Sequence, residues 1–175
     1  KKLIRIDWPY IYTLNIDDGI EKASRKYTPV YPNRELEKYV KRINCIYKLH
    51  GDATNDLVYT KDKSIIFSKG QYLKALKKNA SMYELLKADL LEKNIIFIGC
   101  SLEDELDIRS IIDEIENQSS YVKRYYVTSN DVDELKKHEL ELMGITHILQ
   151  ISDYKEFYED LHKEVSIAII EENDI

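Results

Sequence analysis

The chain of 175 residues is 43% hydrophobic and carries 26 Lys and Arg against 32 Asp and Glu, a formal net charge of −6. These values are ordinary for a globular protein with a sizeable core, and they predict a single domain over residues 1–175. Lys and Arg are dispersed among Asp and Glu, which argues against a nucleic-acid partner because such proteins carry a basic face. No apolar run is long enough to span a membrane, and the first residues lack the apolar region of a signal peptide. We therefore expect a cytoplasmic protein that binds neither nucleic acid nor membranes.

The first half of the chain alternates strand-like and helix-like segments. In order, the sequence predicts a strand at 10–16, a helix at 17–27, a loop with a short charged helix at 28–44, a strand at 45–51, and an excursion or β-hairpin at 52–67. The strands are expected from runs of β-branched and aromatic residues. The loop is expected from Pro29 and Pro32, which interrupt regular structure.

The second half repeats the alternation more regularly. The sequence predicts helices at 68–94, 102–118, 131–144 and 153–173, and strands at 95–101, 122–130 and 145–152. Gly144 is expected to end the third of these helices. Strands that alternate with helices imply crossover connections, so the predicted fold class is α/β with a mostly parallel sheet and helices on both faces.

Three polar clusters fall where predicted strands end. They are Asn15-Ile16-Asp17, His50-Gly51-Asp52 and Gly99-Cys100-Ser101. Ligands of parallel α/β sheets bind at the carboxyl ends of the strands, so we expect the clusters to converge on one ligand. In such a site His50 would be partly exposed. Each cluster also has a structural alternative: Asn15 and Asp17 are favoured types near a helix N-terminus, and a His-Gly pair can simply mark a turn.

Two cysteines, Cys45 and Cys100, have neither zinc-site spacing nor a disulfide framework. Each lies in or beside an apolar strand-like run, and free cysteine is among the most buried residue types. We expect both to be core thiols in a reducing compartment, and we predict no metal site.

The three clusters resemble motifs of the sirtuin-like (silent information regulator) superfamily. The segment TLNID at 13–17 is similar to its T-Q-N-I-D motif and KLHGD at 48–52 to its His-Gly motif. The segment IGCSLEDELDIRSII at 98–112 is similar to the G-x-S-L-x-D stretch of the prokaryotic zinc-free branch of NAD-consuming domains. The resemblance covers most of residues 10–165 and implies a Rossmann-like fold.

The resemblance implies roles around the nicotinamide end of NAD. Asn15 would orient the ribose or the attacking water, and His50 would be the general base, a task that suits imidazole because its pKa lies near neutrality. Ile16 and Asp17 match the positions that hold the nicotinamide carboxamide, where a carboxylate can accept from the amide. Thr13 would shape the pocket floor.

The resemblance also implies contacts with the rest of NAD. Gly51 belongs to the His-Gly motif, and Gly99 and Ser101 match the loop that contacts ADP-ribose, where glycine permits close approach and the hydroxyl can bond an oxygen of the ligand. Asp104 fits two interpretations equally well. It is either a site residue or an acid in the first turn of a helix, where the helix dipole favours it.

In the zinc-free branch such domains cleave NAD to nicotinamide and ADP-ribose. The resemblance therefore implies an NAD hydrolase of antiphage defence, joined to a sensor or effector domain and able to form homo-oligomers. The alternative is a catalytically inert module that binds NAD or an ADP-ribose derivative to regulate a neighbouring domain. The zinc-binding cysteines of protein-deacylating sirtuins are missing, which counts against lysine deacylation.

The sequence departs from the family pattern in two places. Leu14 stands where the motif has Gln. Family members also begin with a strand and a Gly-Ala-Gly phosphate-binding turn, and no glycine-rich loop occurs among the five glycines of this chain. We therefore expect the first βα unit to be missing and the chain to be a piece of a longer protein, whose upstream sequence would favour the enzyme if it encodes that turn.

Overall fold

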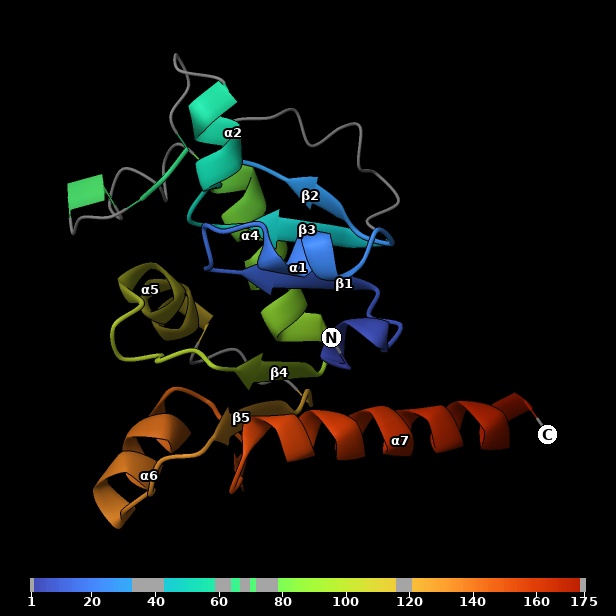
Figure 1. Cartoon of the computed structure of the whole chain (residues 1–175). Coiled ribbons are helices and arrows are strands. Elements are labelled where there is room, and N and C mark those ends of the chain that lie inside the picture. The colour runs from blue at the N-terminus through green and yellow to red at the C-terminus, as the bar shows by residue number, and fades with distance from the viewer. Residues whose placement is uncertain are drawn as a thin grey trace. The chain divides into compact units, whose positions relative to one another are not determined.

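The computed structural model describes residues 2–32, 43–58, 64–66, 70–71, 79–115 and 121–173 (Figure 1). The chain divides into two compact units. Unit 1 comprises Lys1–Met82 and Lys155–Ile175, and unit 2 comprises Tyr83–Tyr154. That the units together make one domain stays a prediction.

Unit 1 contains a parallel sheet of three short strands. Its elements are the 3₁₀ helix η1 (Leu3–Arg5), β1 (Tyr10–Thr13), α1 (Gly19–Ala23), β2 (Thr28–Val30), β3 (Cys45–Lys48), α2 (Ala53–Val58) and most of α7 (Tyr154–Asn173). The strand order is β1-β3-β2, and Thr13 of β1 lies opposite Lys48 of β3. Because β3 is the central strand, all four of its residues are buried.

The core of unit 1 forms around the first strands. Ile4, Tyr27 and Ile46 are its buried centre, and Trp8 packs against them. The Tyr27 hydroxyl donates to the carbonyl oxygen of Ile6 at 2.9 Å, which satisfies a buried polar group that would otherwise be costly. Cys45 is 3% exposed, so the prediction of a core thiol is confirmed at this position.

Unit 2 contains a second parallel sheet. Its elements are α4 (Ala80–Glu92, from Tyr83 on), β4 (Ile95–Ile98), α5 (Leu106–Ile115), β5 (Arg124–Thr128), α6 (Glu134–Leu142) and β6 (His147–Gln150), with strand order β4-β5-β6. The helices bury apolar side chains at helical spacing, namely Tyr83, Leu86 and Leu90 of α4 and Ile108, Ile111, Ile112 and Ile115 of α5. This burial follows the 3.6-residue period of the sequence.

Arg124 joins the ends of two helices in unit 2. It is 8% exposed, and its guanidinium donates to the carbonyl oxygens of Leu90 at 2.8 Å and Gly144 at 3.4 Å. Burial lowers the pKa of Arg124. Gly144 ends α6 with φ +72°, as the sequence predicts, and it supplies one of the two carbonyls.

The parallel α/β architecture is confirmed, and the strands are divided between two sheets of three. Two predictions in the first half are wrong. Thr28–Val30 form strand β2 where a loop is expected, because Pro29 can occupy a strand that pairs on one side. Within residues 52–67, where an excursion or β-hairpin is expected, Ala53–Val58 form helix α2 and not a hairpin strand. The predicted short charged helix falls largely on residues 33–42, outside the described residues.

The second-half elements occur in the predicted order, with shorter bounds. A turn at Asn79 precedes α4, so the segment 68–94 is not one continuous helix. Helix α5 begins at Leu106 after a turn at 102–104. Strand β4 is only half-buried, whereas its apolar sequence predicts a strand covered on both faces.

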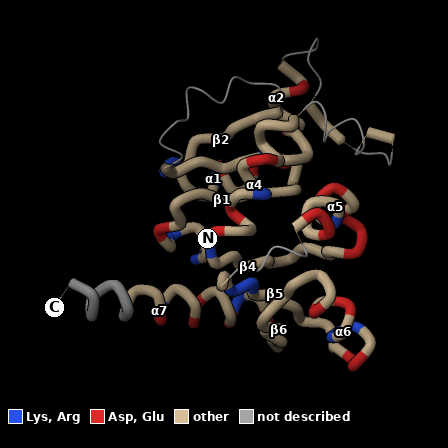
Figure 2. Tube along the Cα trace, turned by 180° about the vertical axis from the view of Figure 1, so that it is seen from behind, with Lys and Arg blue, Asp and Glu red and all other residues tan. Residues whose placement is uncertain are grey.

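Charge is mixed along the helices, with Asp and Glu prominent on α5, on α6 and in the turn before α5 (Figure 2). Among the described helices, none combines the length and the apolar character needed to cross a membrane.

Candidate functional site

The carboxyl ends of β1 and β3 lie side by side in unit 1. Thr13 and Lys48, the last residues of the two strands, are paired in the parallel register. Beyond them the Leu49 N–H donates to the Thr13 carbonyl at 3.0 Å, and the Ala53 N–H donates to the Ile16 carbonyl at 2.8 Å. The structure therefore brings the first two predicted clusters together. The third cluster follows β4 in unit 2, and its convergence with the others stays a prediction.

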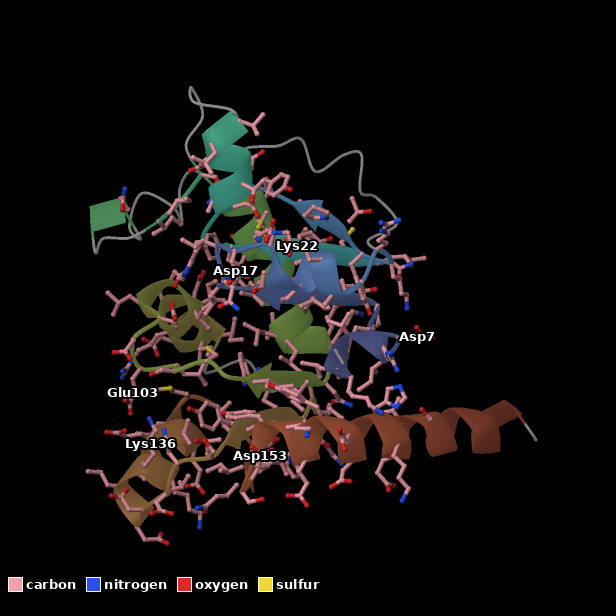
Figure 3. The ribbon with its side chains drawn as sticks, in the orientation of Figure 1. Asp7, Asp17, Lys22, Glu103, Lys136 and Asp153 are labelled. Atoms are coloured by element: carbon pink, nitrogen blue, oxygen red, sulfur yellow. The ribbon has the colours of Figure 1, made fainter. Side chains whose placement is uncertain are left out.

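The loop after β1 carries Asn15 and Asp17. Thr13 is buried, and its hydroxyl oxygen accepts the Asn15 N–H at 3.1 Å, while the side chain of Asn15 is exposed. The Asp17 carboxylate accepts the Gly19 N–H at 2.7 Å at the start of α1. Asp17 is labelled beside this helix in Figure 3. The helix N-terminus interpretation therefore holds for Asp17, because its Oδ1 accepts the N–H of the first residue of α1. The side chain of Asn15 accepts no N–H from the first turn of α1.

His50 is 5% exposed, so the expectation of a partly exposed imidazole is wrong. The chain returns beside the His-Gly turn at residues 64–66. The Ile66 N–H donates to the His50 carbonyl at 3.1 Å, which holds this segment against the His-Gly turn. The catalytic role of His50 stays a prediction.

Position 51 requires glycine for two reasons, its backbone conformation and the close approach of the main chain at Ser64 and Ile65. Its φ is +87°, and a Cβ there would lie 2.5 Å from the carbonyl carbon and oxygen of Ser64 and 2.7 Å from the Ile65 nitrogen. Its N–H donates to the Lys48 carbonyl at 3.1 Å, which closes a turn. For Gly51 the turn interpretation is therefore sufficient, since no other residue fits without moving the backbone.

Asp52 precedes helix α2, which lies where an excursion or β-hairpin is expected. It is 2% exposed, and its Oδ1 accepts the Asn55 N–H at 2.6 Å, which is the geometry of a helix N-cap. Its own N–H donates to the hydroxyl of Ser64 at 3.1 Å. Asp52 thus fixes the start of α2 beside the His-Gly turn.

Asp56, one turn further along α2, holds the returning segment. Its carboxylate accepts the hydroxyl of Ser64 at 2.7 Å, the Ser64 N–H at 2.9 Å and the Ile65 N–H at 3.1 Å. Burial alone would raise the pKa of Asp56, but these hydrogen bonds outweigh it and lower the pKa. An ionised Asp56 therefore anchors the segment that bonds the main chain of His50.

Lys48 is a site residue that the sequence interpretation missed. Its side chain is fully buried, and its ammonium binds the Asp17 carbonyl at 2.5 Å, Asp52 Oδ2 at 2.6 Å and Glu21 Oε1 at 2.9 Å. Burial acts to lower the pKa of Lys48, but the hydrogen bonds to Asp52 and Glu21 prevail and raise it. The sequence signal that could have identified Lys48 is a lysine at the last position of an apolar strand, four residues before Asp52.

The third cluster forms a turn of its own in unit 2. Gly99 has φ +64° and is exposed, and the Ser101 hydroxyl donates to Asp104 Oδ2 at 3.0 Å. Asp104 precedes α5, so the first-turn interpretation of Asp104 is wrong. Cys100 is half-buried, which only partly fits a core thiol. Burial, with smaller contributions from Glu105 and Asp107, raises its pKa to about 12.

Comparison with known proteins adds two findings. Residues 9–148 match the family model described as the SIR2-like domain. The chain is also 28% identical, over 177 aligned positions, to the NAD(+) hydrolase ThsA of Enterococcus faecium. That alignment covers 83% of this chain and 35% of the relative, so the chain spans about a third of the relative's length.

Proposed function

The chain belongs to the SIR2-like domain family, and from this premise we propose that it supplies the site at which its protein hydrolyses NAD to nicotinamide and ADP-ribose. One structural observation carries the proposal. The loops that hold Asn15 and His50 leave adjacent parallel strands at the same edge and are tied together by the bond from Ala53 to Ile16. The similarity to a relative named as an NAD(+) hydrolase supports the same reaction.

The proposed reaction breaks the bond between nicotinamide and C1′ of its ribose. The bonding electron pair leaves with nicotinamide, whose ring nitrogen becomes neutral. A water oxygen forms the new bond to C1′, and His50 takes a proton from that water as general base. Asn15 would place the water or the ribose through its amide. A positioned base of this kind contributes about 10²–10⁴-fold to a rate.

Other residues would hold the two ends of NAD. The bond from Gly19 occupies Oδ1 of Asp17, and we assign Oδ2 to the carboxamide NH₂ of nicotinamide, with Ile16 and Thr13 beside it. Ser101 and Asp104 would face the ADP-ribose part. The turn that carries them is rich in Asp and Glu (Figure 2), and carboxylates suit ribose hydroxyls better than a diphosphate. We therefore place a ribose there.

A second candidate function is a module that binds NAD or ADP-ribose without turnover. The burial of His50 favours it, because an imidazole that is 5% exposed meets little solvent. The two candidates differ in one measurement. The enzyme releases nicotinamide from NAD, whereas the module binds ADP-ribose and releases none.

The test is NAD hydrolysis by the full-length protein and by its His50→Ala and Asn15→Ala variants. Each variant should lose about 10²–10⁴-fold in kcat if the proposed roles are right. Asn130→Ala is the matched control. The Asn130 N–H bonds the Thr128 hydroxyl oxygen at 3.1 Å, as the Asn15 N–H bonds that of Thr13, but Asn130 lies outside the three clusters. His138→Ala is the corresponding control for His50, because His138 is exposed on α6.

A folded His50→Ala protein with wild-type turnover would remove the general base from the proposal. A wild-type protein that binds ADP-ribose but releases no nicotinamide would establish the binding module instead. Folding of each variant is checked by comparing its circular dichroism spectrum and thermal unfolding with those of the wild-type protein.

The finer aspects of the proposal follow from the family resemblance. We propose that hydrolysis needs no metal, that it occurs in the cytoplasm, and that it serves antiphage defence under a sensor or effector domain, with oligomers as the active form. Turnover should survive exhaustive chelation, and cellular NAD should fall on phage infection only in cells with the wild-type protein. Loss of turnover with chelator, restored by zinc, would contradict the metal-free reaction.

A further inference from the structure

The ammonium of Lys48 is fully coordinated inside unit 1. An ammonium offers three N–H donors, and Lys48 Nζ has three acceptors within 2.9 Å, namely the Asp17 carbonyl, Glu21 Oε1 and Asp52 Oδ2. The Lys48 side chain is fully buried and that of Asp52 is 2% exposed, so water does not compete for these bonds. Such charge-assisted bonds are short and directional.

The three acceptors lie on three different segments. Asp17 is in the loop that carries Asn15, Glu21 is on α1, and Asp52 is the N-cap of α2 directly after the His50-Gly51 turn. The bond to Asp17 goes to its main-chain oxygen, so it acts on the path of the loop and leaves the Asp17 carboxylate for other partners. Lys48 therefore links the loop of one motif to the loop of the other.

We propose that Lys48 is a positioning residue for the nicotinamide end of the site: its ammonium sets the distance between the Asn15–Asp17 loop and the His50–Asp52 turn. A buried ion pair is a weak source of stability, because desolvation offsets much of its attraction. Its directional bonds still fix geometry, and a displacement of about 1 Å in a reacting group can cost about 10²-fold in rate. This inference rests on the proposed NAD hydrolysis.

Lys48→Met removes the ammonium while keeping a long apolar side chain. It leaves two buried carboxylates without their cation, so this variant risks failing to fold. Glu21→Gln is the milder second variant, because glutamine keeps an oxygen for Lys48 and removes only one charge. Lys22→Met is the matched control. Lys22 lies on the same helix (Figure 3), pairs with Asp18 and has a side chain 75% exposed.

The first measurement is independent of catalysis. Hydrogen exchange of the Ala53 and Gly19 amides reports the Asn15–Asp17 loop, because these N–H groups bond Ile16 and Asp17. Exchange at both should be about 10-fold faster or more in Lys48→Met and about 2–10-fold faster in Glu21→Gln, the effect of one net hydrogen bond. The Met143 amide, bonded to Glu139 in unit 2, should exchange as in the wild type.

The second measurement separates positioning from a general structural role. Because the Asp17 loop is assigned to nicotinamide, each variant that folds should weaken nicotinamide inhibition at least about threefold more than it weakens ADP-ribose binding, and should lower kcat more than it raises KM for NAD. Lys22→Met should change none of these values. A structural role alone would weaken both ligands equally.

The outcomes are distinct. Failure of the wild-type protein to hydrolyse NAD overturns the proposed function, and the exchange rates then decide alone whether Lys48 holds the loop. If Glu21→Gln and any folded Lys48→Met keep wild-type exchange at Ala53 and Gly19, the positioning role is overturned. If exchange is faster but nicotinamide inhibition and ADP-ribose binding weaken equally, Lys48 has only a structural role, and the positioning role is overturned as well.

Discussion

Replacement of Gly51 by alanine should destabilise unit 1 strongly, because Gly51 meets two independent constraints. Its φ of +87° is in the left-handed region, which costs a residue with a Cβ about 1–2 kcal/mol. The new Cβ would also lie 2.5 Å from main-chain atoms of Ser64, and backbone cannot rotate away as a flexible side chain can. Overpacking of this kind costs about 1–3 kcal/mol.

The sum predicts a loss of roughly 2–5 kcal/mol in the free energy of unfolding for Gly51→Ala. At about 2 kcal/mol of stability lost per molar urea, a typical value for a small protein, the urea midpoint should fall by about 1–2.5 M. Trp8 packs against the core of unit 1, and its fluorescence therefore reports the unfolding of the unit that contains Gly51.

Two other glycines separate the two costs. A Cβ on Gly70 would meet no atom within 4 Å, and its φ is ordinary, so Gly70→Ala should change stability by less than about 0.5 kcal/mol. Gly99 has φ +64° with open space around it, so Gly99→Ala in unit 2 should show the conformational cost alone. If Gly51→Ala unfolds at the same urea concentration as Gly70→Ala, the close packing of residues 64–66 against the His-Gly turn is wrong.

Three further predictions concern single groups. Folding lowers the pKa of Asp56, so its contribution to stability is complete above the unfolded pKa of about 3.9 and is lost as pH falls through the folded pKa. In Asp56→Asn the free energy of unfolding should therefore fall less steeply with decreasing pH below about pH 5. With a pKa of about 12, Cys100 should be about one part in 10⁴ thiolate at pH 8 and should react with a disulfide reagent at least about 100-fold more slowly than free cysteine. Arg124→Met loses two bonds to helix-end carbonyls and should lower the free energy of unfolding by about 2–4 kcal/mol in urea denaturation.

Each of these predictions has a control. Asp160→Asn, at an exposed position on α7, should keep the wild-type acid profile, and an equal flattening there would refute the role of Asp56. Cys100→Ser should leave the slow reaction of buried Cys45, and rapid labelling of the wild-type protein would contradict the raised pKa. Arg109→Met, at an exposed site on α5, should be nearly neutral, and equal destabilisation by both arginine variants would argue against the Arg124 bonds.

The amino-acid sequence by itself determined the order of elements and the parallel α/β class. Hydrophobic period and strand-end residues are local properties, so the strands at Tyr10–Thr13 and Cys45–Lys48 could be predicted, and the helix-ending glycine, Gly144, as well. The same pattern placed Asn15 and His50 after strand ends. Parallel pairing of the two strands then makes their loops neighbours, which the structure confirms.

Only the tertiary structure decided how that neighbourhood is held together. Nothing local to residues 45–51 predicts that Lys48 binds the main chain 31 positions away, or that the chain returns at residues 64–66 to donate the Ile66 N–H to the His50 carbonyl. Strand β2 and helix α2 were missed for the same reason. A three-residue strand containing Pro29 and a helix of six residues have weak intrinsic preferences, and their formation depends on pairing with β3 and on the Asp52 cap. Long-range hydrogen bonds, which no window of sequence contains, determine both the position of residues 64–66 at the His-Gly turn and the position of the Asn15–Asp17 loop beside it.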